Sequence, residues 1–257
     1  DEDPGEAVRQ AIARLDDNPD DALALFVMAE VYSRAERLGV AANLLKRVLD
    51  LKPERAEAWN NLGLCYSGMG RYKEARAAFD EAHRRFPKSH MALANIAMCL
   101  FQEMKFEEAA KWCRKALAIE PTSKAAQNTL GMCQLSTGQW AEGFKHYASS
   151  VGGKFRKQNQ YKSEGMWDGT PGQSVVFYGE QGLGDEIMFA SCIPDAEKVC
   201  KTVILECDKR LTGLFTRSFP GVHVYGTRRQ TECTWLQTEA VDASLPVGQL
   251  PQFFRAS

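Results

Sequence analysis

Four prolines divide the first half of the chain into segments of equal length, because Pro19, Pro53, Pro87 and Pro121 lie 34 residues apart. Between them, apolar residues recur at helical spacing, and each proline follows a second helical stretch that it cannot continue. A helix pair of this length cannot bury its apolar side alone. The interval therefore predicts a stack of helix pairs, each of which buries its core against its neighbours.

The segment 56–89 shows the repeating pattern most completely. Its matching residues are Trp59, Leu62, Gly63, Tyr66, Ala75, Phe79, Ala82 and Pro87. They resemble the signature of the tetratricopeptide repeat (TPR). Further units are expected at about 22–55, 90–123 and 124–150, with residues 4–16 as a leading half-unit. The resemblance predicts a TPR α-solenoid over residues 1–150.

The last unit departs from the signature. Gln134 and Gly143 stand where an aromatic residue and an alanine are usual. Such a departure is expected in a terminal repeat, whose outer side meets something other than another repeat.

The charge balance excludes several classes of partner. The 32 Lys and Arg residues oppose 33 Asp and Glu residues, so no global field would draw the chain to nucleic acid or to anionic lipid. No uncharged apolar stretch reaches the roughly 18 residues of a membrane span, and the acidic first residues lack an apolar leader. We expect a cytoplasmic protein with no nucleic-acid partner and no membrane span.

The eight cysteines include no C-x-x-C pair and no His/Cys cluster with zinc-ligand spacing. Cys65, Cys99 and Cys133 occupy the same position in successive units, which indicates shared packing rather than redox chemistry. We expect reduced, mostly buried thiols and no metal site.

The first helices of successive TPR units line the concave surface of a stack. The positions expected there are unusually apolar and rich in sulfur. Our candidate peptide-binding residues are Asn61, Asn95, Leu64, Met98, Phe101 and Met132. The same surface could instead dock the chain's own second domain or a second copy in a homodimer.

Asn61 and Asn95 share one position in successive units. They resemble the asparagine ladder by which TPR-bearing O-GlcNAc transferases hold an extended peptide. An amide offers both a donor and an acceptor, which suits sequence-tolerant binding of a peptide backbone. An asparagine at this position could equally bond within its own repeat.

A second domain follows the repeats. A basic, glycine-rich segment over residues 151–172 predicts a linker. The stretches that follow alternate between buried strands, at 174–178, 202–207 and 222–226, and helices, at 186–200 and 208–219. This order predicts parallel strands joined by right-handed crossovers. We therefore expect an α + α/β chain in which residues 173–257 form a partial Rossmann-like domain.

The segment GEQGLGD, residues 179–185, follows the first expected strand and opens a helix. Ligands of parallel sheets lie beyond the carboxyl ends of the strands, and a glycine loop offers free amide groups to an anion. The candidate ligand-binding residues are Glu180, Gln181, Gly182 and Gly184. The G-x-G-x-x-G fingerprint is absent, which disfavours a nicotinamide dehydrogenase. Arg228 and Arg229 could contact a phosphate at the same edge.

The residues Trp167, Asp168 and Gly169, followed by VVFYGEQGLGDEIMFASCIPD, resemble proteins that join TPR repeats to a glycosyltransferase domain. That domain is related to the ADP-heptose:LPS heptosyltransferases of glycosyltransferase family 9. The resemblance implies a GT-B fold, in which two Rossmann-like halves face each other, and a nucleotide-sugar donor without another cofactor. About 85 residues follow the linker, too few for the second half, so we expect a truncated enzyme that is inactive alone.

The resemblance assigns Asp185 as the catalytic base, because it corresponds to the aspartate of the family's Gly-Asp motif. The structural alternative is that Asp185 caps the helix it opens. Two functions follow. In the first, the repeats recruit a protein or glycan acceptor to a glycosyltransferase; in the second, the chain is a non-catalytic scaffold for protein interactions.

Overall fold

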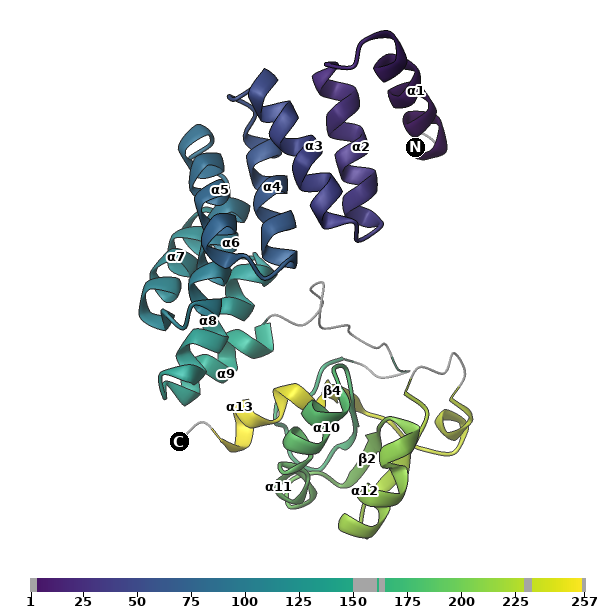
Figure 1. Ribbon diagram of the computed structural model, residues 1–257. Coiled ribbons are helices and arrows are strands. Elements are labelled where there is room, and N and C mark those ends of the chain that lie inside the picture. Colours follow the sequence, from purple (N-terminus) through teal and green to yellow (C-terminus); the bar gives the residue numbers. More distant parts are fainter. Residues whose placement is uncertain (1–3, 150–160, 162–164, 229–232, 256–257) are drawn as a thin grey trace. The chain divides into compact units, whose positions relative to one another are not determined.

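The computed structural model describes residues 4–149, 161, 165–228 and 233–255 (Figure 1). The chain forms two compact units, Asp1–Cys133 and Gln134–Ser257, and the boundary between them in the sequence falls within helix α8. We describe each unit by itself.

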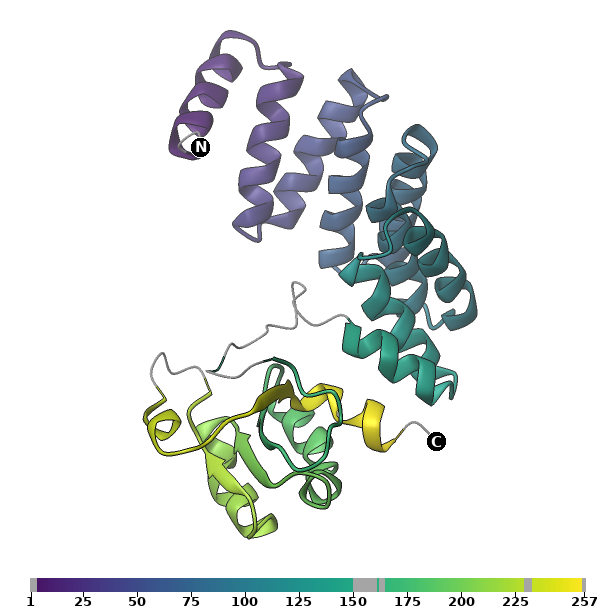
Figure 2. The same ribbon diagram turned by 180° about the vertical axis from the view of Figure 1, so that it is seen from behind.

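The repeats form the helix pairs that the 34-residue interval predicts. The leading half-unit is helix α1, Pro4–Asp17. The paired helices are α2 (Ala22–Arg34) with α3 (Leu38–Leu51), α4 (Ala56–Gly68) with α5 (Tyr72–Arg85), α6 (His90–Gln102) with α7 (Phe106–Ile119), and α8 (Lys124–Ser136) with α9 (Trp140–Ser149). Figures 1 and 2 show successive helices of the first unit side by side, in chain order.

The turn inside each pair has the same backbone conformation. Its residue with a positive φ recurs every 34 residues and is Glu36, Gly70, Met104 or Gly138, with φ between 58° and 76°. Glycine adopts this left-handed conformation without strain, whereas Glu36 and Met104 adopt it at a cost of about 1 kcal/mol. The period of the sequence is therefore also a period of the backbone.

Close contact between helices forms the core of each repeat. Gly63 of α4 lies against the ring of Phe79 of α5, and a Cβ atom on Gly63 would lie 2.5 Å from that ring. The cysteines at the shared position, Cys65, Cys99 and Cys133, are buried in the same core, as their spacing predicts. Burial raises the pKa of Cys99 to about 12 and that of Cys133 to about 11, so both thiols are neutral at physiological pH.

The second unit contains a small parallel sheet. Its strands are β1 (Ser174–Tyr178), β2 (Thr202–Glu206), β3 (His223–Tyr225) and β4 (Ala243–Pro246). Their order in the sheet is β3-β2-β1-β4, and every pair is parallel. The predicted parallel sheet is thus confirmed, with a fourth strand that the sequence did not indicate.

Helices cover one face of this sheet. They are α10 (Leu183–Ala190), α11 (Ile193–Glu197) and α12 (Thr212–Ser218), which follows the 3-10 turn η1 (Lys209–Leu211). Their apolar side chains pack on Val175, Phe177, Val203 and Leu205. The other face carries Val176 and Ile204, which pack on Trp235 of the 3-10 turn η2 (Thr234–Gln237).

The helix expected at 186–200 is interrupted. Helix α10 begins earlier, at Leu183, and ends at Ala190, and α11 begins at Ile193 with Pro194 in its first turn. Proline lacks the amide hydrogen that a continuous helix needs, but it fits the start of a new one. The expectation of one helix was therefore wrong, and the chain turns between the two.

Strand β4 has a covered outer edge. The amide of Trp167 donates to the carbonyl of Ser244 at 3.0 Å, and the amide of Ser244 donates to the carbonyl of Gly165 at 3.2 Å. Trp167 is buried against Phe177 and Phe253, with ring centroids 5.5 and 4.9 Å away. The end of the expected linker is thus part of the sheet unit.

Helix α9 packs with the sheet unit, although the repeat pattern assigns it to the solenoid. It contacts the turn η3 (Val247–Gln249) and helix α13 (Pro251–Phe254), which follow β4. The buried Gln249 donates from Nε2 to the carbonyl of Ala148 at 3.0 Å, near the end of α9. The last repeat helix therefore packs on a turn and a short helix of the sheet unit rather than on a further repeat.

The contact between Gly63 and Phe79 generates a stability prediction. Gly63→Ala should lower the free energy of unfolding by about 1–3 kcal/mol, because the added methyl group overlaps the Phe79 ring. Gly39→Ala is the matched control, since Gly39 lies in α3 with open space around its Cβ position; it should stabilise by about 0.5–1 kcal/mol. Thermal unfolding followed by circular dichroism measures both. Equal effects would contradict the packing.

Candidate functional site

The first helices of the repeats form a surface that we call the first-helix face, made by α2, α4, α6 and α8. It exposes large apolar side chains at Leu23, Leu64 and Met91, whose exposed fractions are 47%, 46% and 60%. Met98, Phe101 and Met132 are half-buried on the same helices. The candidate apolar residues are thus accessible to a partner to different degrees.

Of the two candidate asparagines, Asn95 bonds to a neighbouring repeat. Asn95 donates from Nδ2 to Oδ1 of Asn60 at 3.1 Å, which links α6 to α4. The alternative that Asn95 bonds within its own repeat is therefore wrong. Asn61 lies beside this pair in the sequence and lines two cavities of the face. Sequence reasoning missed Asn60, because position comparison alone singled out Asn61.

The larger cavity has a volume of about 580 Å³ and spans three successive repeats. Phe26 of α2, Asn60 and Asn61 of α4 and Met91 of α6 all line it. A smaller cavity of about 160 Å³ lies between α2 and α4, and its lining includes Asn61 and Leu64. Side chains of an extended partner could enter both cavities.

Two methionines of the face contact amides one helical turn away. Gln102 Nε2 lies 3.9 Å from Sδ of Met98, and Asn128 Nδ2 lies 4.0 Å from Sδ of Met132. Phe101 packs on Phe106 with ring centroids 5.4 Å apart, so part of the Phe101 ring is buried in the core of its own repeat. Phe101 is therefore a weaker candidate for partner contact than the sequence indicated.

The glycine-rich loop lies where the sequence predicts, at the carboxyl end of β1. Gly182 precedes α10, and its amide donates to Oδ2 of Asp185 at 3.0 Å. Asp185 thus caps the helix from its first turn, through one carboxylate oxygen. A Cβ atom at Gly179 would overlap the carboxyl group of Glu186, which explains the glycine there.

Gln181 is held by a residue from α9. The hydroxyl of Tyr147 donates to Oε1 of Gln181 at 2.8 Å, and the ring of Tyr147 lies 6.2 Å from that of Phe189. The amide nitrogen of Gln181 donates to Oε1 of Glu180 at 2.9 Å. The loop is therefore bonded to the last repeat helix. Gly184 lies in the first turn of α10, with open space at its Cβ position.

A buried ion pair fixes three loops at this edge. Glu186 is 2% exposed and accepts hydrogen bonds from Arg228 and, at 2.9 Å, from the amide of Asp208. Arg228 also donates to the carbonyl of Gln181. The guanidinium that could have contacted a phosphate is thus bound to protein groups. Arg229 lies outside the described residues.

The opposite face of the sheet has a second buried carboxylate. Glu206, the last residue of β2, accepts hydrogen bonds from Tyr161 and, at 2.8 Å, from Thr227. Nearby, Glu239 accepts from the hydroxyl of Tyr225 at 2.6 Å and raises the pKa of Tyr225 to about 12. No sequence pattern indicated Glu206, because an acidic residue that ends a strand is ordinarily exposed.

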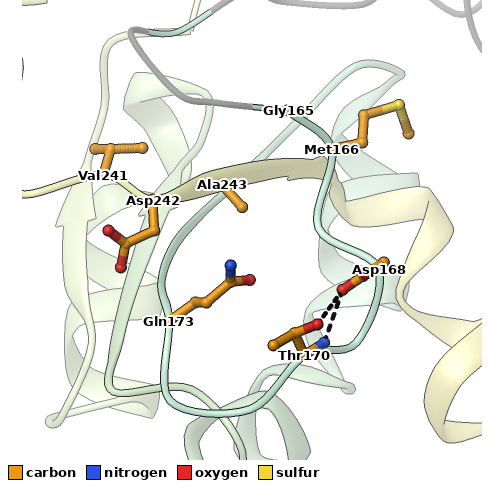
Figure 3. Close-up of a pocket in the computed structure, with 8 residues that line it drawn as sticks. All are labelled: Gly165, Met166, Asp168, Thr170, Gln173, Val241, Asp242 and Ala243. Atoms are coloured by element: carbon orange, nitrogen blue, oxygen red, sulfur yellow. Dashed lines mark hydrogen bonds between the residues drawn. The ribbon is translucent and has the colours of Figure 1, made fainter.

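Figure 3 shows a pocket of about 390 Å³ at the other end of the sheet. Gln173 and Asp242, which precede β1 and β4, line it, and the Gln173 amide extends toward its middle. Thr170 donates to Asp168 on its rim and holds the pKa of Asp168 below its ordinary value. The pocket lies at the amino ends of the strands, away from the edge where ligands of parallel sheets bind.

Within the described parts of the chain, no three His, Cys, Asp or Glu residues are grouped as metal ligands would be. The same residues contain no helix with the length and apolar character that a membrane crossing requires.

Tetratricopeptide-repeat family models match residues 44–77 and 66–124. Protein FlbA of Caulobacter vibrioides is 30% identical over 223 residues, which cover 82% of this chain and 37% of FlbA. Human tetratricopeptide repeat protein 7B is 30% identical over 86 residues, which cover 34% of this chain and 10% of that protein. The chain therefore spans little more than a third of FlbA. The match to FlbA covers more of the chain than the repeats do, so it reaches the sheet unit.

Solved TPR structures resemble the repeats. MamA is 19% identical, with a TM-score of 0.51, over 56% of this chain and 84% of that one. PilW, a type IV pilus biogenesis factor, is 28% identical, with a TM-score of 0.50, over 57% of this chain and 71% of that one. Together with the family models, they show that the chain contains tetratricopeptide repeats.

The ion pair between Arg228 and Glu186 generates a second prediction. Arg228→Met should destabilise the sheet unit by about 3–5 kcal/mol, because Glu186 then keeps a buried charge without its cation. Hydrogen exchange of β1 and β2 measures the loss locally. The double variant Glu186→Gln/Arg228→Met should recover part of it. Arg217→Met, at an exposed position of α12, is the control and should change little. An equally small effect of Arg228→Met would show that the pair is not structural.

Proposed function

We propose that the chain is a scaffold whose first-helix face binds a segment of a partner protein. The observation that carries this function is the cavity of about 580 Å³ that Phe26, Asn61 and Met91 line across three repeats. A surface built from successive repeats is continuous, so it can hold a segment longer than one repeat. Exposed Leu64 and Met91 supply apolar area that a partner would remove from water.

The scaffold function predicts that a charge in place of an apolar side chain on the first-helix face weakens binding. Leu64→Arg should weaken binding of peptides selected from a random library by tenfold or more, about 1.4 kcal/mol, because the arginine disrupts an apolar contact. Leu51→Arg is the matched control, since Leu51 is 38% exposed on α3 rather than 46% exposed on α4. Fluorescence anisotropy measures both affinities. Equal losses, or selection of no binding peptide by the parent chain, would contradict the scaffold.

We further propose that the sheet unit is the first part of a glycosyltransferase domain in the full-length protein. Its strand order β3-β2-β1-β4 supports this function, because doubly wound nucleotide-binding sheets begin with the same order. The resemblance around Asp185 supports it also. The capping bond to Gly182 uses only Oδ2 of Asp185, so the other oxygen can accept a proton from a sugar hydroxyl. The repeats would then bring the acceptor to the enzyme.

The transferase function predicts that Asp185→Asn lowers sugar transfer by about 10²–10⁴-fold in the full-length protein. Asparagine can still accept the Gly182 amide, so this variant removes the base and keeps the helix cap. Asp195→Asn, in the first turn of α11, is the control and should retain activity. Transfer from a panel of labelled nucleotide sugars is the measurement. Full activity of Asp185→Asn would leave Asp185 as a cap alone, and no transfer by the parent protein would exclude the transferase.

A further inference from the structure

The charges around the larger cavity of the first-helix face are not balanced. Three carboxylates and two guanidinium groups line the cavity, and they belong to Glu30, Glu54, Glu57, Arg55 and Arg85. Phenylalanine, methionine and alanine side chains line it as well, so the cavity is an apolar groove with a charged border. A partner can pair only with those charges that are not already paired within the protein.

Both arginines are engaged by the protein itself. The guanidinium of Arg55 lies 4.0 Å from the ring centroid of Phe26, and its Nε atom lies 3.9 Å from the carboxylate of Glu57. Arg85 donates to the carbonyl of Glu81 at 3.0 Å and pairs with the carboxylate of the same residue. The two arginines and Glu57 therefore have partners of opposite charge without any ligand.

Glu30 and Glu54 have no such partner. Glu30 is half-buried in α2, and Glu54 is exposed in the turn between α3 and α4. Within residues 4–149, all of which the structure describes, neither side chain forms an ion pair or a hydrogen bond. Arg34, one turn along α2, lines the smaller cavity and does not pair with Glu30. The larger cavity therefore keeps two negative charges that nothing in the protein compensates.

Glu30 lies where the two cavities of the face adjoin, because it lines both of them. A half-buried carboxylate interacts more strongly with a cation than a fully exposed one does, since less water screens the pair. A segment bound over Glu30 would remove more of this water. The carboxylate would then be a buried charge without a counter-ion unless the segment supplied a cation.

Lysine and arginine combine the two features that this cavity requires, an apolar stem and a cationic end. Phe86 and Met91 are 58% and 60% exposed and offer apolar area to the stem and to its neighbours in a partner. The contact of Arg55 with Phe26 shows that a guanidinium packs on an apolar group of the same cavity. An acidic side chain would be repelled by the unpaired carboxylates.

We propose that the partner of the first-helix face is a polypeptide segment in which a lysine or arginine stands among apolar residues. Its cation pairs with Glu30, Glu54 adds to the attraction, and its apolar neighbours contact Phe86 and Met91. This proposal rests on the scaffold function and specifies the chemistry of the partner.

The test measures the binding of three peptide pools to the whole chain. Each peptide has about twelve residues, enough to extend across several repeats, with apolar residues around two central positions. Those positions are Lys or Arg in the basic pool, Gln or Ser in the uncharged pool, and Asp or Glu in the acidic pool. Fluorescence anisotropy gives the affinities in about 0.05 and 0.5 M NaCl, because salt weakens the attraction between charges.

Two variants test the half-buried carboxylate. Glu30→Gln removes the charge and keeps the size of the side chain, and Glu30→Lys reverses the charge. Glu108→Gln is the matched control, because it removes the same charge at an exposed position of α7, outside both cavities. Circular dichroism checks the fold of each variant, and binding of the uncharged pool checks the apolar contacts.

We expect the parent chain to bind the basic pool at least tenfold more tightly than the acidic pool, with the stronger effect of salt on the basic one. Glu30→Gln should weaken binding of the basic pool about tenfold, because a charge-assisted contact is lost, and should change binding of the uncharged pool less than about twofold. Glu30→Lys should remove the preference for the basic pool. Glu108→Gln should retain the affinities of the parent chain.

A preference of the parent chain for the uncharged or the acidic pool would overturn the basic partner and leave the scaffold function intact. The same conclusion would follow if Glu30→Gln and Glu108→Gln affected the basic pool to the same extent, since the preference would then not come from this cavity. Binding of no pool would count against the scaffold function itself.

Discussion

A helix pair of the repeats has more apolar surface than it can bury alone, and the rest of the structure follows from this shortage. Each pair meets it through the next pair, with close contacts such as Gly63 against Phe79 setting the separation of the helices. A stack solves the problem everywhere except at its ends. At the last repeat, η3 and α13 of the sheet unit pack on α9. They bury the apolar side of α9 that a further repeat would otherwise cover.

Helix α9 also contributes to the carboxyl edge of the sheet. The hydroxyl of Tyr147 in α9 donates to the side chain of Gln181 in the glycine-rich loop, and Arg228, which is paired with Glu186, donates to the carbonyl of the same residue. The loop is therefore held by groups from α9, from the segment that follows β3 and, through Asp185, from its own helix. Asp185 keeps one oxygen outside these bonds. An edge held in this way keeps the Asp185 carboxylate in one place, which the proposed base would require.

The helix pairs and the alternation of strands and helices could be predicted from the sequence, because each follows a regular pattern of residues. The 34-residue interval predicted the helix pairs, and the strand stretches at 174–178 and 202–207 were located almost to the residue. Strand β4 was missed because its four residues, which end at Pro246, have neither length nor alternation. The break between α10 and α11 followed from Pro194, which the apolar pattern around it concealed.

The candidate sites show the same difference between residues that follow a local pattern and residues that do not. Residues that repeat, such as Asn61 and Asn95, and residues in a glycine-rich motif, such as Asp185, were proposed from position alone, and their roles stay predictions. Partners brought together from distant segments were not, because no local pattern links Asn60 to Asn95, Tyr147 to Gln181 or Arg228 to Glu186. Sequence reasoning proposed the surfaces, and long-range contacts determine which of their atoms are already bonded to other parts of the protein.

The membership of α9 in the sheet unit has a consequence for how such a chain can evolve. The repeat pattern suggests that the two parts join at the glycine-rich linker, where modules are usually exchanged. A gene fusion at that point would separate α9 from Gln249 and Gln181, leaving an uncovered helix on one product and a loosened loop on the other. Repeats can be gained or lost ahead of α8 without this damage, so the solenoid can change in length while its final helix is inherited with the sheet.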